Sequence, residues 1–448
     1  MPPADTAGQG RKPPLAPGAL ATAPRPAPVP PRTGRTAPDR GCSTRGRDHR
    51  WPHPPHRREP PRRHRRPARL AAALATATAL ATLTPAPQAA ASTTRGHEGT
   101  QRVLDTAVAD GVPGALARAR DRHGVWNGTA GTADLDTGRA RGADDRFRIG
   151  SVTKTFVATV LLQLQGERRI DLDDTIDQHL PGLVDGHGHD GTAITLRQLL
   201  NHTSGISNYT ADPEFRRRAF GEEFLDHRYD TWKPGQLVAV AMRHAPDFAP
   251  GTSWNYSNTN YILAGMVIEK VTGHGWEKEV ERRILRPLGL RGTSAPRTDP
   301  HLPRPAGRAY SFLGDPDREH PYDVTELNPS QAGAAGAMIS TTADLDRFQR
   351  ALLGGRLLPP DQLRQMTTTV EVHPSAPHVR YGLGLMRQTL SCGIRIWGHD
   401  GGIHGSATLA FTTRDTRHSY QANLNGEWSP SDPADAVALT EAEFCREG

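Results

Sequence analysis

The chain is poor in cysteine and has no strong membrane anchor in its body. Only three of its 448 residues are cysteine, and no stretch beyond the first hundred residues has the length and apolarity of an anchor. The chain also lacks a G-x-S-x-G string, which argues against an α/β-hydrolase. We therefore expect a folded body without a stable membrane anchor, whose chemistry rests on other motifs.

Excess positive charge is confined to the first 91 residues. The whole chain carries a formal charge of +7, but residues 1–91 carry +12 and residues 92–448 carry −5. The first segment also holds 19 of the 39 prolines, a composition that buries too little apolar surface to fold. The mildly acidic remainder lacks the positive charge that binds a phosphate backbone, so we expect no nucleic-acid partner.

Residues 62–91 have the composition of a secretory signal peptide. A basic stretch precedes an Ala/Leu/Thr-rich segment at 70–83, and the small-residue run 89–91 follows. This order predicts export and cleavage rather than a transmembrane helix. Arginine pairs leave twin-arginine export open as a minority alternative to the Sec route. We expect a secreted, extracellular catalytic domain at 92–448, while 1–61 is a disordered Pro/Arg-rich tail or, in the interpretation we favour, a mis-assigned start.

Two cysteines remain after the expected cleavage. Cys42 lies upstream, and no apolar run precedes it, which argues against a lipoprotein site. Cys392 and Cys445 are left as a pair in an exported chain. A disulfide that ties the C-terminus to the strand before His399 is one expectation, and two buried thiols are the alternative.

Hydrophobic periodicity predicts strands at both ends of the body and helices between them. Helices are expected over 101–110, 153–165, 196–200, 260–271, 340–354 and 433–444. Strands are expected before 148, with turns at Asn127-Gly128 and Thr137-Gly138, and over 382–390, 394–397, 406–412 and 418–424. The predicted fold class is α/β (α+β): an antiparallel sheet flanked by helices, with an inserted, mostly helical domain at roughly 170–330.

The first candidate motif is Ser-Val-Thr-Lys at 151–154, at the start of a predicted helix. A serine hydroxyl needs a base within hydrogen-bond reach. Since the residue three positions on faces the same side of a helix, Lys154 can approach the oxygen of Ser151. The helix dipole favours the negative charge that develops during attack. Alone, the string more often marks a helix cap followed by a solvated lysine.

The second candidate motif is Tyr-Ser-Asn at 256–258. Tyr256 can relay a proton if Lys154, assisted by a protonated His399, lowers its pKa. Asn258 carries a donor and an acceptor, so it can hold the lysine and grip a substrate amide. A turn before a helix is the commoner meaning of this string alone.

The third candidate motif is Gly-His-Asp-Gly-Gly at 398–402, predicted at a strand edge. Gly401 and Gly402 let a substrate backbone approach as an added strand. The amides of Ser151 and Gly402 would then form an oxyanion hole. Alone, the string is more often a Gly-rich turn with a satisfied histidine.

Neither a metal nor another cofactor is expected. The string His187-Gly188-His189-Asp190 is similar to zinc ligands of metallohydrolases, but the spacing fails at Gly191. No convincing later ligands appear in the sequence, so a polar loop is the better interpretation.

In this order, the three motifs resemble those of the serine penicillin-recognising proteins, which include serine-type D-alanyl-D-alanine carboxypeptidases and class C β-lactamase-like enzymes. The resemblance runs from about Val103 to Cys445 and includes 199–205 and 381–385. It implies a β-lactamase/transpeptidase-like fold, and the placement of Cys392 looks like that of the carboxypeptidase disulfide. The roles that it implies are nucleophile for Ser151, proton transfer for Lys154 and Tyr256, and substrate binding for Asn258, His399, Gly401 and Gly402.

The third motif departs from the carboxypeptidase pattern. Those enzymes hold a terminal carboxylate with hydroxyls around this motif and with an arginine. Here Asp400 replaces the expected threonine, Gly402 has no hydroxyl, and Met386 aligns with the arginine. Arg387 should point to the opposite face of its strand. An acidic Asp400 would repel a substrate carboxylate. The motifs therefore support the acyl-transfer chemistry more strongly than they support a D-Ala-D-Ala substrate.

The resemblance implies a serine hydrolase that works through an acyl-enzyme, and with the predicted export we expect a secreted monomer. The first expectation is carboxypeptidase-type cleavage of peptidoglycan-related D-amino-acid peptides, with β-lactams as acylating ligands. A β-lactamase, an esterase or a D-aminopeptidase on the same machinery are alternatives. A penicillin-binding sensor without catalysis is a further one.

Overall fold

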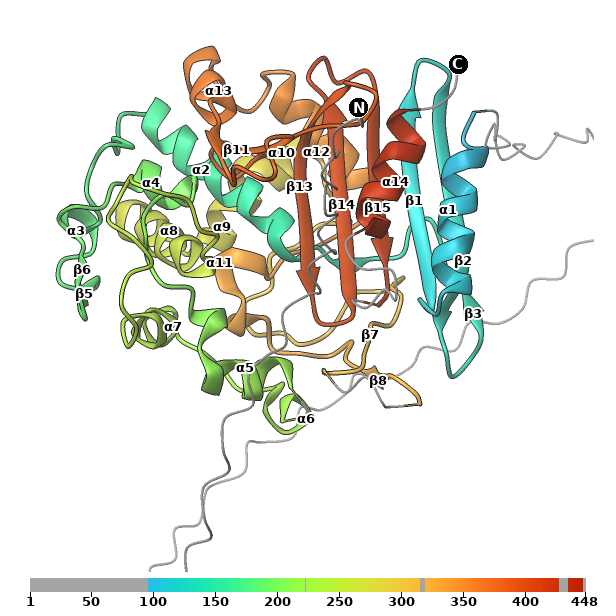
Figure 1. The fold of residues 1–448 in the computed structure, drawn as a ribbon, viewed down its shortest axis with the longest axis horizontal. Helices are drawn as coiled ribbons and strands as arrows, with labels where there is room; N and C mark the ends of the chain where they lie inside the picture. The colour runs from blue at the N-terminus through green and yellow to red at the C-terminus, as the bar shows by residue number, and fades with distance from the viewer. Residues whose placement is uncertain (1–95, 222, 315–318, 427–433, 446–448) are drawn as a thin grey trace, which may run out of the picture. The chain divides into compact units, whose positions relative to one another are not determined.

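A nine-stranded antiparallel sheet is the frame of the fold (Figure 1), with the strand order β10-β11-β12-β13-β14-β15-β1-β2-β3. β1 pairs with both β2 and β15, so strands from both ends of the folded region share one sheet, as the sequence predicts. The strands are β1 (Gly114–Asp121), β2 (Gly124–Asp134), β3 (Arg139–Ala140), β10 (Val370–Glu371), β11 (Val379–Tyr381), β12 (Met386–Thr389), β13 (Arg395–Ile403), β14 (Ser406–Thr413) and β15 (Ser419–Leu424).

The computed structural model describes residues 96–221, 223–314, 319–426 and 434–445. All of them belong to one compact unit, Thr84–Gly448. The expected tail (1–61) and signal peptide (62–91) lie outside the described residues. None of the helices in the described ranges combines the length and apolarity that crossing a membrane requires.

Helices cover both faces of the sheet. α1 (Glu98–Ala109) and α14 (Ala434–Phe444) lie side by side (Figure 1), and both contribute to an apolar cluster with β1, β14 and β15. α12 (Thr342–Leu353) packs on β14 and β15, and its Phe348 belongs to the other large apolar cluster. The sheet is therefore the middle layer between two apolar cores.

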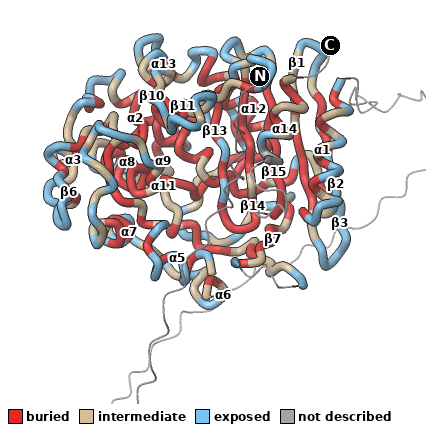
Figure 2. The backbone as a smooth tube through the Cα atoms, viewed as in Figure 1, coloured by how far each residue is buried: buried red, intermediate tan, exposed pale blue. Residues whose placement is uncertain are grey.

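The chain between β4 and β10 is mostly helical and forms the rest of the body. α2 is buried on almost every side, as its red colour in Figure 2 shows. The helices are α2 (Thr153–Gly166), α3 (Ile176–His179), α4 (Leu196–Leu200), α5 (Pro213–Phe220), α6 (Phe224–His227), α7 (Pro234–Ala241), α8 (Asn258–Thr272), α9 (Trp276–Val280), α10 (Arg286–Leu288), α11 (Gly333–Gly336) and α13 (Pro360–Thr367). The helical part thus begins before residue 170 and continues beyond 330. Short strand pairs interrupt it, namely β4 (Phe147–Arg148) with β9 (Ile339–Ser340), β5 (Asp185–Gly186) with β6 (His189–Asp190), and β7 (Tyr310–Ser311) with β8 (Tyr322–Asp323).

The turn predicted at Asn127-Gly128 is wrong, because both residues lie inside β2. Gly128 pairs with Ala117 of β1. A Cβ on Gly128 would stand 2.2 Å from the indole ring of Trp126. The glycine therefore makes room for a buried tryptophan in the strand, whereas the predicted turn at Thr137-Gly138 is present between β2 and β3.

The single strand predicted over 382–390 is interrupted. β11 ends at Tyr381 and β12 begins at Met386, with an irregular turn between them. Gly384 in this turn has a φ of 67°, and its carbonyl accepts a hydrogen bond from Thr155 of α2. The turn is shaped by its packing on α2, which local hydrophobic alternation does not encode.

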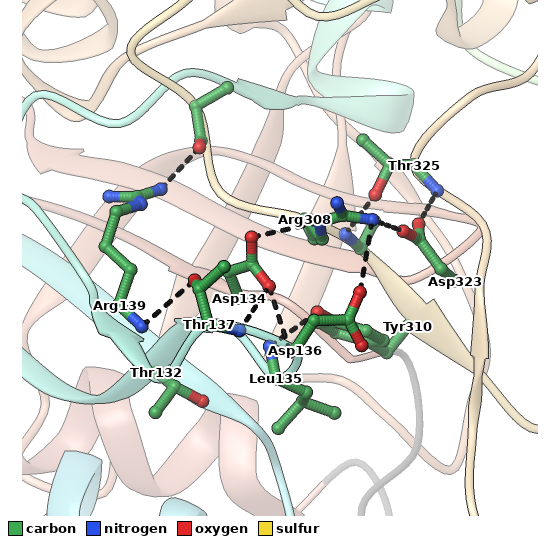
Figure 3. Close-up of polar contacts among 12 residues, drawn as sticks. Thr132, Asp134, Leu135, Asp136, Thr137, Arg139, Arg308, Tyr310, Asp323 and Thr325 are labelled. Atoms are coloured by element: carbon green, nitrogen blue, oxygen red, sulfur yellow. Dashed lines mark hydrogen bonds and ion pairs between the residues drawn. The ribbon is translucent and has the colours of Figure 1, made fainter.

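Arg308 ties the segment before β7 to the β2–β3 hairpin (Figure 3). Its guanidinium forms ion pairs with Asp134 and Asp136 of the hairpin and with Asp323 of β8. Next to it, the hydroxyl of Tyr310 accepts a hydrogen bond from the Leu135 amide at 2.7 Å. These contacts anchor a long irregular segment on the edge of the sheet.

Cys392 and Cys445 form a disulfide. It joins the turn between β12 and β13 to the residue after α14. Glu441 of α14 also accepts hydrogen bonds from the amide and the hydroxyl of Ser391. The C-terminal helix is therefore held to the strand pair that leads into the third motif.

The third motif approaches the nucleophile segment through glycine. A Cβ on Gly401 would stand 2.1 Å from the Ile149 carbonyl oxygen and 3.0 Å from the Ser151 amide nitrogen, whereas a Cβ on Gly402 would meet no atom within 4 Å. β13 and the turn that carries Ser151 can therefore touch only because residue 401 has no side chain.

We expect Gly401→Ala to lower stability by about 1–3 kcal/mol, because the new methyl group overpacks this contact. It should also lower activity by moving the Ser151 amide. Thermal unfolding and turnover measure the two effects, and Gly402→Ala is the matched control for the stability measurement. Equal melting temperatures for the two variants would contradict the close approach.

Candidate active site

Ser151 lies in a single 3-10 turn, Gly150–Val152, that leads directly into α2. Gly150 has a φ of 50°, and a Cβ on it would stand 2.9 Å from the Gly402 amide nitrogen. The sequence correctly places Ser151 at a helix N-terminus. The turn presents the hydroxyl at the start of a buried helix and brings the amides of Ser151 and Gly402 near each other.

Lys154 is fully buried, and its Nζ lies among three oxygen atoms. These atoms are Asn258 Oδ1 at 2.7 Å, the Ala335 carbonyl oxygen at 2.7 Å and Ser151 Oγ at 2.9 Å. The amide and carbonyl oxygens can only accept hydrogen bonds. A neutral amine donates its two hydrogens to them and still has a lone pair for the Ser151 hydroxyl. The geometry thus allows a deprotonated lysine to accept the proton of Ser151.

Burial also lowers the pKa of Lys154 well below its usual value, and the charge of Asp400 opposes this shift only in part. In the described residues, no carboxylate lies within 4.0 Å of the lysine nitrogen to stabilise the ammonium form. Desolvation is therefore the physical cause that favours the neutral amine of this lysine.

Tyr256 stacks beside the lysine, with Nζ 4.8 Å from the centre of its ring. Burial raises the pKa of Tyr256 well above 10, and an interaction with Ser151 offsets this only in part. Within the described ranges, the phenol oxygen has no partner at full hydrogen-bond geometry. The expected phenolate is thus not favoured, and Tyr256 is placed as a neutral hydroxyl that can pass a proton on.

Asn258 is the first residue of α8, and its Oδ1 accepts a hydrogen bond from the lysine. Its Nδ2 donates to Thr210 Oγ1 at 3.1 Å, and its backbone amide donates to Asn208 Oδ1 at 3.1 Å. These contacts fix the orientation of the side-chain amide, with the oxygen toward Lys154. One hydrogen of Nδ2 remains for a substrate.

His399 is buried, and both of its ring nitrogens are engaged. Nδ1 lies 2.6 Å from the Asp400 carbonyl oxygen, and Nε2 lies 2.8 Å from the Tyr381 hydroxyl. Since the carbonyl only accepts, Nδ1 donates to it and Nε2 accepts from the tyrosine. Direct assistance to Tyr256, as expected from the sequence, would require His399 to release Tyr381.

His202 is a site residue to which the sequence assigned no role. Its Nδ1 accepts hydrogen bonds from the Ser257 amide and from Asn260 Nδ2, and its ring centre lies 4.3 Å from that of Tyr256. Burial lowers its pKa well below 6.5. A neutral His202 therefore supports the turn that carries Tyr256. The signal that could have identified His202 is its position in the stretch 199–205, which resembles the family.

A largely apolar cavity of about 70 Å³ opens beside Ser151. His404 closes one side, stacked on Phe220 and Phe224, and burial lowers its pKa to about 4. No lysine or arginine is among the lining residues, which are Ser151, Tyr209, Thr210, Phe215, Phe220, Asn258, Gln331, Ala332, Ala335, Gly336, Gly402, Ile403 and His404. Local sequence patterns offered no means of finding this cavity.

The predicted site residues thus divide into groups. Ser151, Tyr256 and Asn258 surround the amine of Lys154, and Gly402 borders the cavity beside Ser151. Gly401 faces the nucleophile turn, whereas His399 faces Tyr381. The rejected zinc string, His187-Gly188-His189-Asp190, lies in the β5–β6 hairpin.

Comparisons with known proteins agree with this geometry. The family model described as Beta-lactamase matches residues 100–442. Penicillin-binding protein 4 of Amycolatopsis lactamdurans is 29% identical over 293 residues, which are 64% of this chain and 70% of that protein. The predicted family resemblance and fold class are therefore confirmed.

Two solved structures are similar over most of their length. A D-stereospecific amidohydrolase from Streptomyces sp. is 59% identical, with a TM-score of 0.73 over 78% of this chain and 98% of that chain. The D-amino acid amidase from Ochrobactrum anthropi SV3 complexed with D-phenylalanine is 27% identical, with a TM-score of 0.67 over 77% of this chain and 97% of that chain. Motifs, fold and family model agree, and the chain belongs to the Beta-lactamase family as a serine hydrolase.

Proposed function

We propose that the protein hydrolyses amides and peptides of D-amino acids through an acyl-enzyme on Ser151. The observation that carries the substrate class is the 59% identity to the D-stereospecific amidohydrolase, over 98% of that chain. This class was an alternative in the sequence interpretation. It now takes precedence over carboxypeptidase-type cleavage, because the cavity beside Ser151 offers no cation for a substrate carboxylate.

In the proposed first step, Ser151 Oγ attacks the substrate carbonyl while its proton moves to the neutral amine of Lys154. The lysine is 2.9 Å from that oxygen. Breakage of the C–N bond then requires a proton on the leaving amine. The Tyr256 hydroxyl, beside the lysine, passes this proton on, and the acyl-enzyme remains.

Water completes the proposed cycle. It attacks the ester carbonyl and gives its proton to the same Lys154–Tyr256 pair, which returns a proton to Ser151 as the acid leaves. In both steps, the amides of Ser151 and Gly402 donate to the developing oxyanion. Their closeness through Gly150 and Gly401 supports this role.

The apolar cavity is the proposed site for the side chain of the acyl residue. Phe215, Phe220 and Ile403 line it next to Ser151. Burial of a large apolar side chain there favours binding by about 1.5–3 kcal/mol. We therefore expect a preference for D-residues with aromatic or large aliphatic side chains, as in D-phenylalanine amide.

Acylation by β-lactams is a second part of the proposal, favoured by the likeness to penicillin-binding proteins. Export rests on the composition of residues 62–91 alone and stays a prediction. The expected monomer stays a prediction as well.

Ser151→Ala should lower hydrolysis of D-phenylalanine amide at least about 10³-fold, because the acyl-enzyme cannot form. It should also abolish labelling by a fluorescent penicillin. Ser375→Ala, at an exposed loop position, is the control. Retained turnover in Ser151→Ala would contradict the nucleophile assignment. A wild type that cuts D-Ala-D-Ala peptides but no D-amide would restore the carboxypeptidase expectation.

Lys154→Arg should lower kcat/KM about 10²–10⁴-fold, because a guanidinium cannot act as a base. Lys270→Arg, at an exposed position of α8, is the matched control. In the wild type, kcat/KM should rise with pH through the lowered pKa of Lys154 and level off well below pH 10.5. A rate that still rises tenfold per pH unit up to pH 10.5 would contradict a depressed lysine pKa.

A further inference from the structure

Asp400 is a charged residue near the nucleophile that the proposed mechanism does not use. It directly follows His399 in β13, and its side chain is 53% exposed. Successive residues of a strand point to opposite faces, so Asp400 shares its face with Gly402 and not with Gly401. Gly402 borders the cavity next to Ser151, and a Cβ there would meet no atom within 4 Å. Asp400 therefore leaves β13 on the face opposite to that of Gly401, and about half of its side chain is exposed.

The strand next to Asp400 supplies no compensating cation. Pairing between β12 and β13 stops at Gly398, opposite Met386. Met386 packs against the apolar cluster of α1 and α14. Arg387 pairs with Trp397 and so lies on the opposite face. The position that would hold an arginine for a carboxylate is therefore apolar.

The Asp400 carboxylate has only one partner that can carry positive charge. Within 4.0 Å of it, the described ranges contain His399 Nδ1, at 3.4 Å, and no lysine or arginine nitrogen. The proton on that nitrogen is already donated to the Asp400 carbonyl oxygen. Burial works to raise the pKa of Asp400, but the contact with His399, a backbone hydrogen bond and the nearby Lys154 together lower it below its usual value. The site thus presents a carboxylate at neutral pH.

The position of Asp400 along β13 assigns it to one side of the scissile bond. The cavity proposed for the acyl side chain is lined by Gly402, Ile403 and His404, which follow Asp400, but not by Asp400 itself. Its carboxylate lies instead 3.4 Å from Nδ1 of His399, whose ring centre is 6.3 Å from that of Tyr256 in the proposed Lys154–Tyr256 pair. That pair delivers the proton to the leaving group, so Asp400 lies on the leaving-group side.

We propose that Asp400 makes the leaving-group side of the site reject leaving groups that end in a carboxylate and prefer neutral or cationic ones. This inference rests on the proposed amide hydrolysis and adds the charge of the leaving group to the substrate description. The carboxylates of Asp400 and of such a leaving group would repel each other, and this repulsion is strongest where protein atoms displace water. Asp400 is thus a specificity-determining residue, and it makes the enzyme a poor carboxypeptidase.

The test compares two substrates of nearly equal size, D-phenylalanyl-glycine and D-phenylalanyl-glycinamide. Release of D-phenylalanine is followed for the full chain and for Asp400→Asn. In the wild type, kcat/KM for the glycinamide should exceed that for the free acid at least tenfold. In Asp400→Asn, the ratio should fall to within about threefold, chiefly because the free acid is cut faster. A gain of activity cannot come from misfolding.

Two variants and one further substrate sharpen the test. Asp400→Glu keeps the charge and should retain most of the preference, and Asp110→Asn, at an exposed position after α1, should leave it unchanged. D-phenylalanine 2-aminoethylamide, whose leaving group is cationic, should lose kcat/KM in Asp400→Asn. Since a change in Lys154 affects all substrates alike, the ratio isolates the role of Asp400.

The outcomes separate this inference from the proposed function. If the wild type cuts both dipeptides equally, or if Asp400→Asn leaves the ratio unchanged, the inference is wrong and the amide hydrolysis stands. If the wild type cuts neither D-phenylalanyl substrate, the proposed function fails and the inference fails with it. A ratio that collapses only in Asp400→Asn supports both.

Discussion

The burial of one lysine amine is the constraint on which the active site depends. Lys154 lies inside α2, a helix covered on almost all sides, and its nitrogen has access only to oxygen atoms that the fold supplies. An ammonium group is costly in such a place, so the deprotonated form is favoured. The core that stabilises the fold therefore also favours the neutral amine that the proposed mechanism uses as its base.

The sheet and the helical part each supply half of the machinery. The turn before α2 carries the serine, α2 the lysine and α8 the asparagine, while β13 brings the amide of Gly402 and the charge of Asp400. Backbone contact at Gly401 joins the halves, because only a residue without a side chain fits against Ile149. Proton transfer is thus set by the helices, and the proposed substrate preference by the strand.

Much of the fold and the reacting groups were predictable from sequence, because both have local signals. The period of apolar residues placed α2, α4, α8 and α12, and spacing of three placed Lys154 beside Ser151. Features that depend on distant contacts were missed or misjudged. The Asn-Gly pair at Gly128 is typical of a turn, whereas the glycine is needed in the strand to make room for the ring of Trp126. The role of His202 and the cavity closed by His404 also depend on residues far apart in the chain.

The protonation state of Lys154 is the central claim, and NMR titration of its side chain tests it most directly. The chain contains five lysines, so labelling of lysine side chains gives few signals, and Lys154→Met identifies the relevant one by its loss. The account predicts that this signal titrates well below pH 10.5, away from exposed lysines such as Lys270. A signal that titrates at or above pH 10.5 would contradict the account.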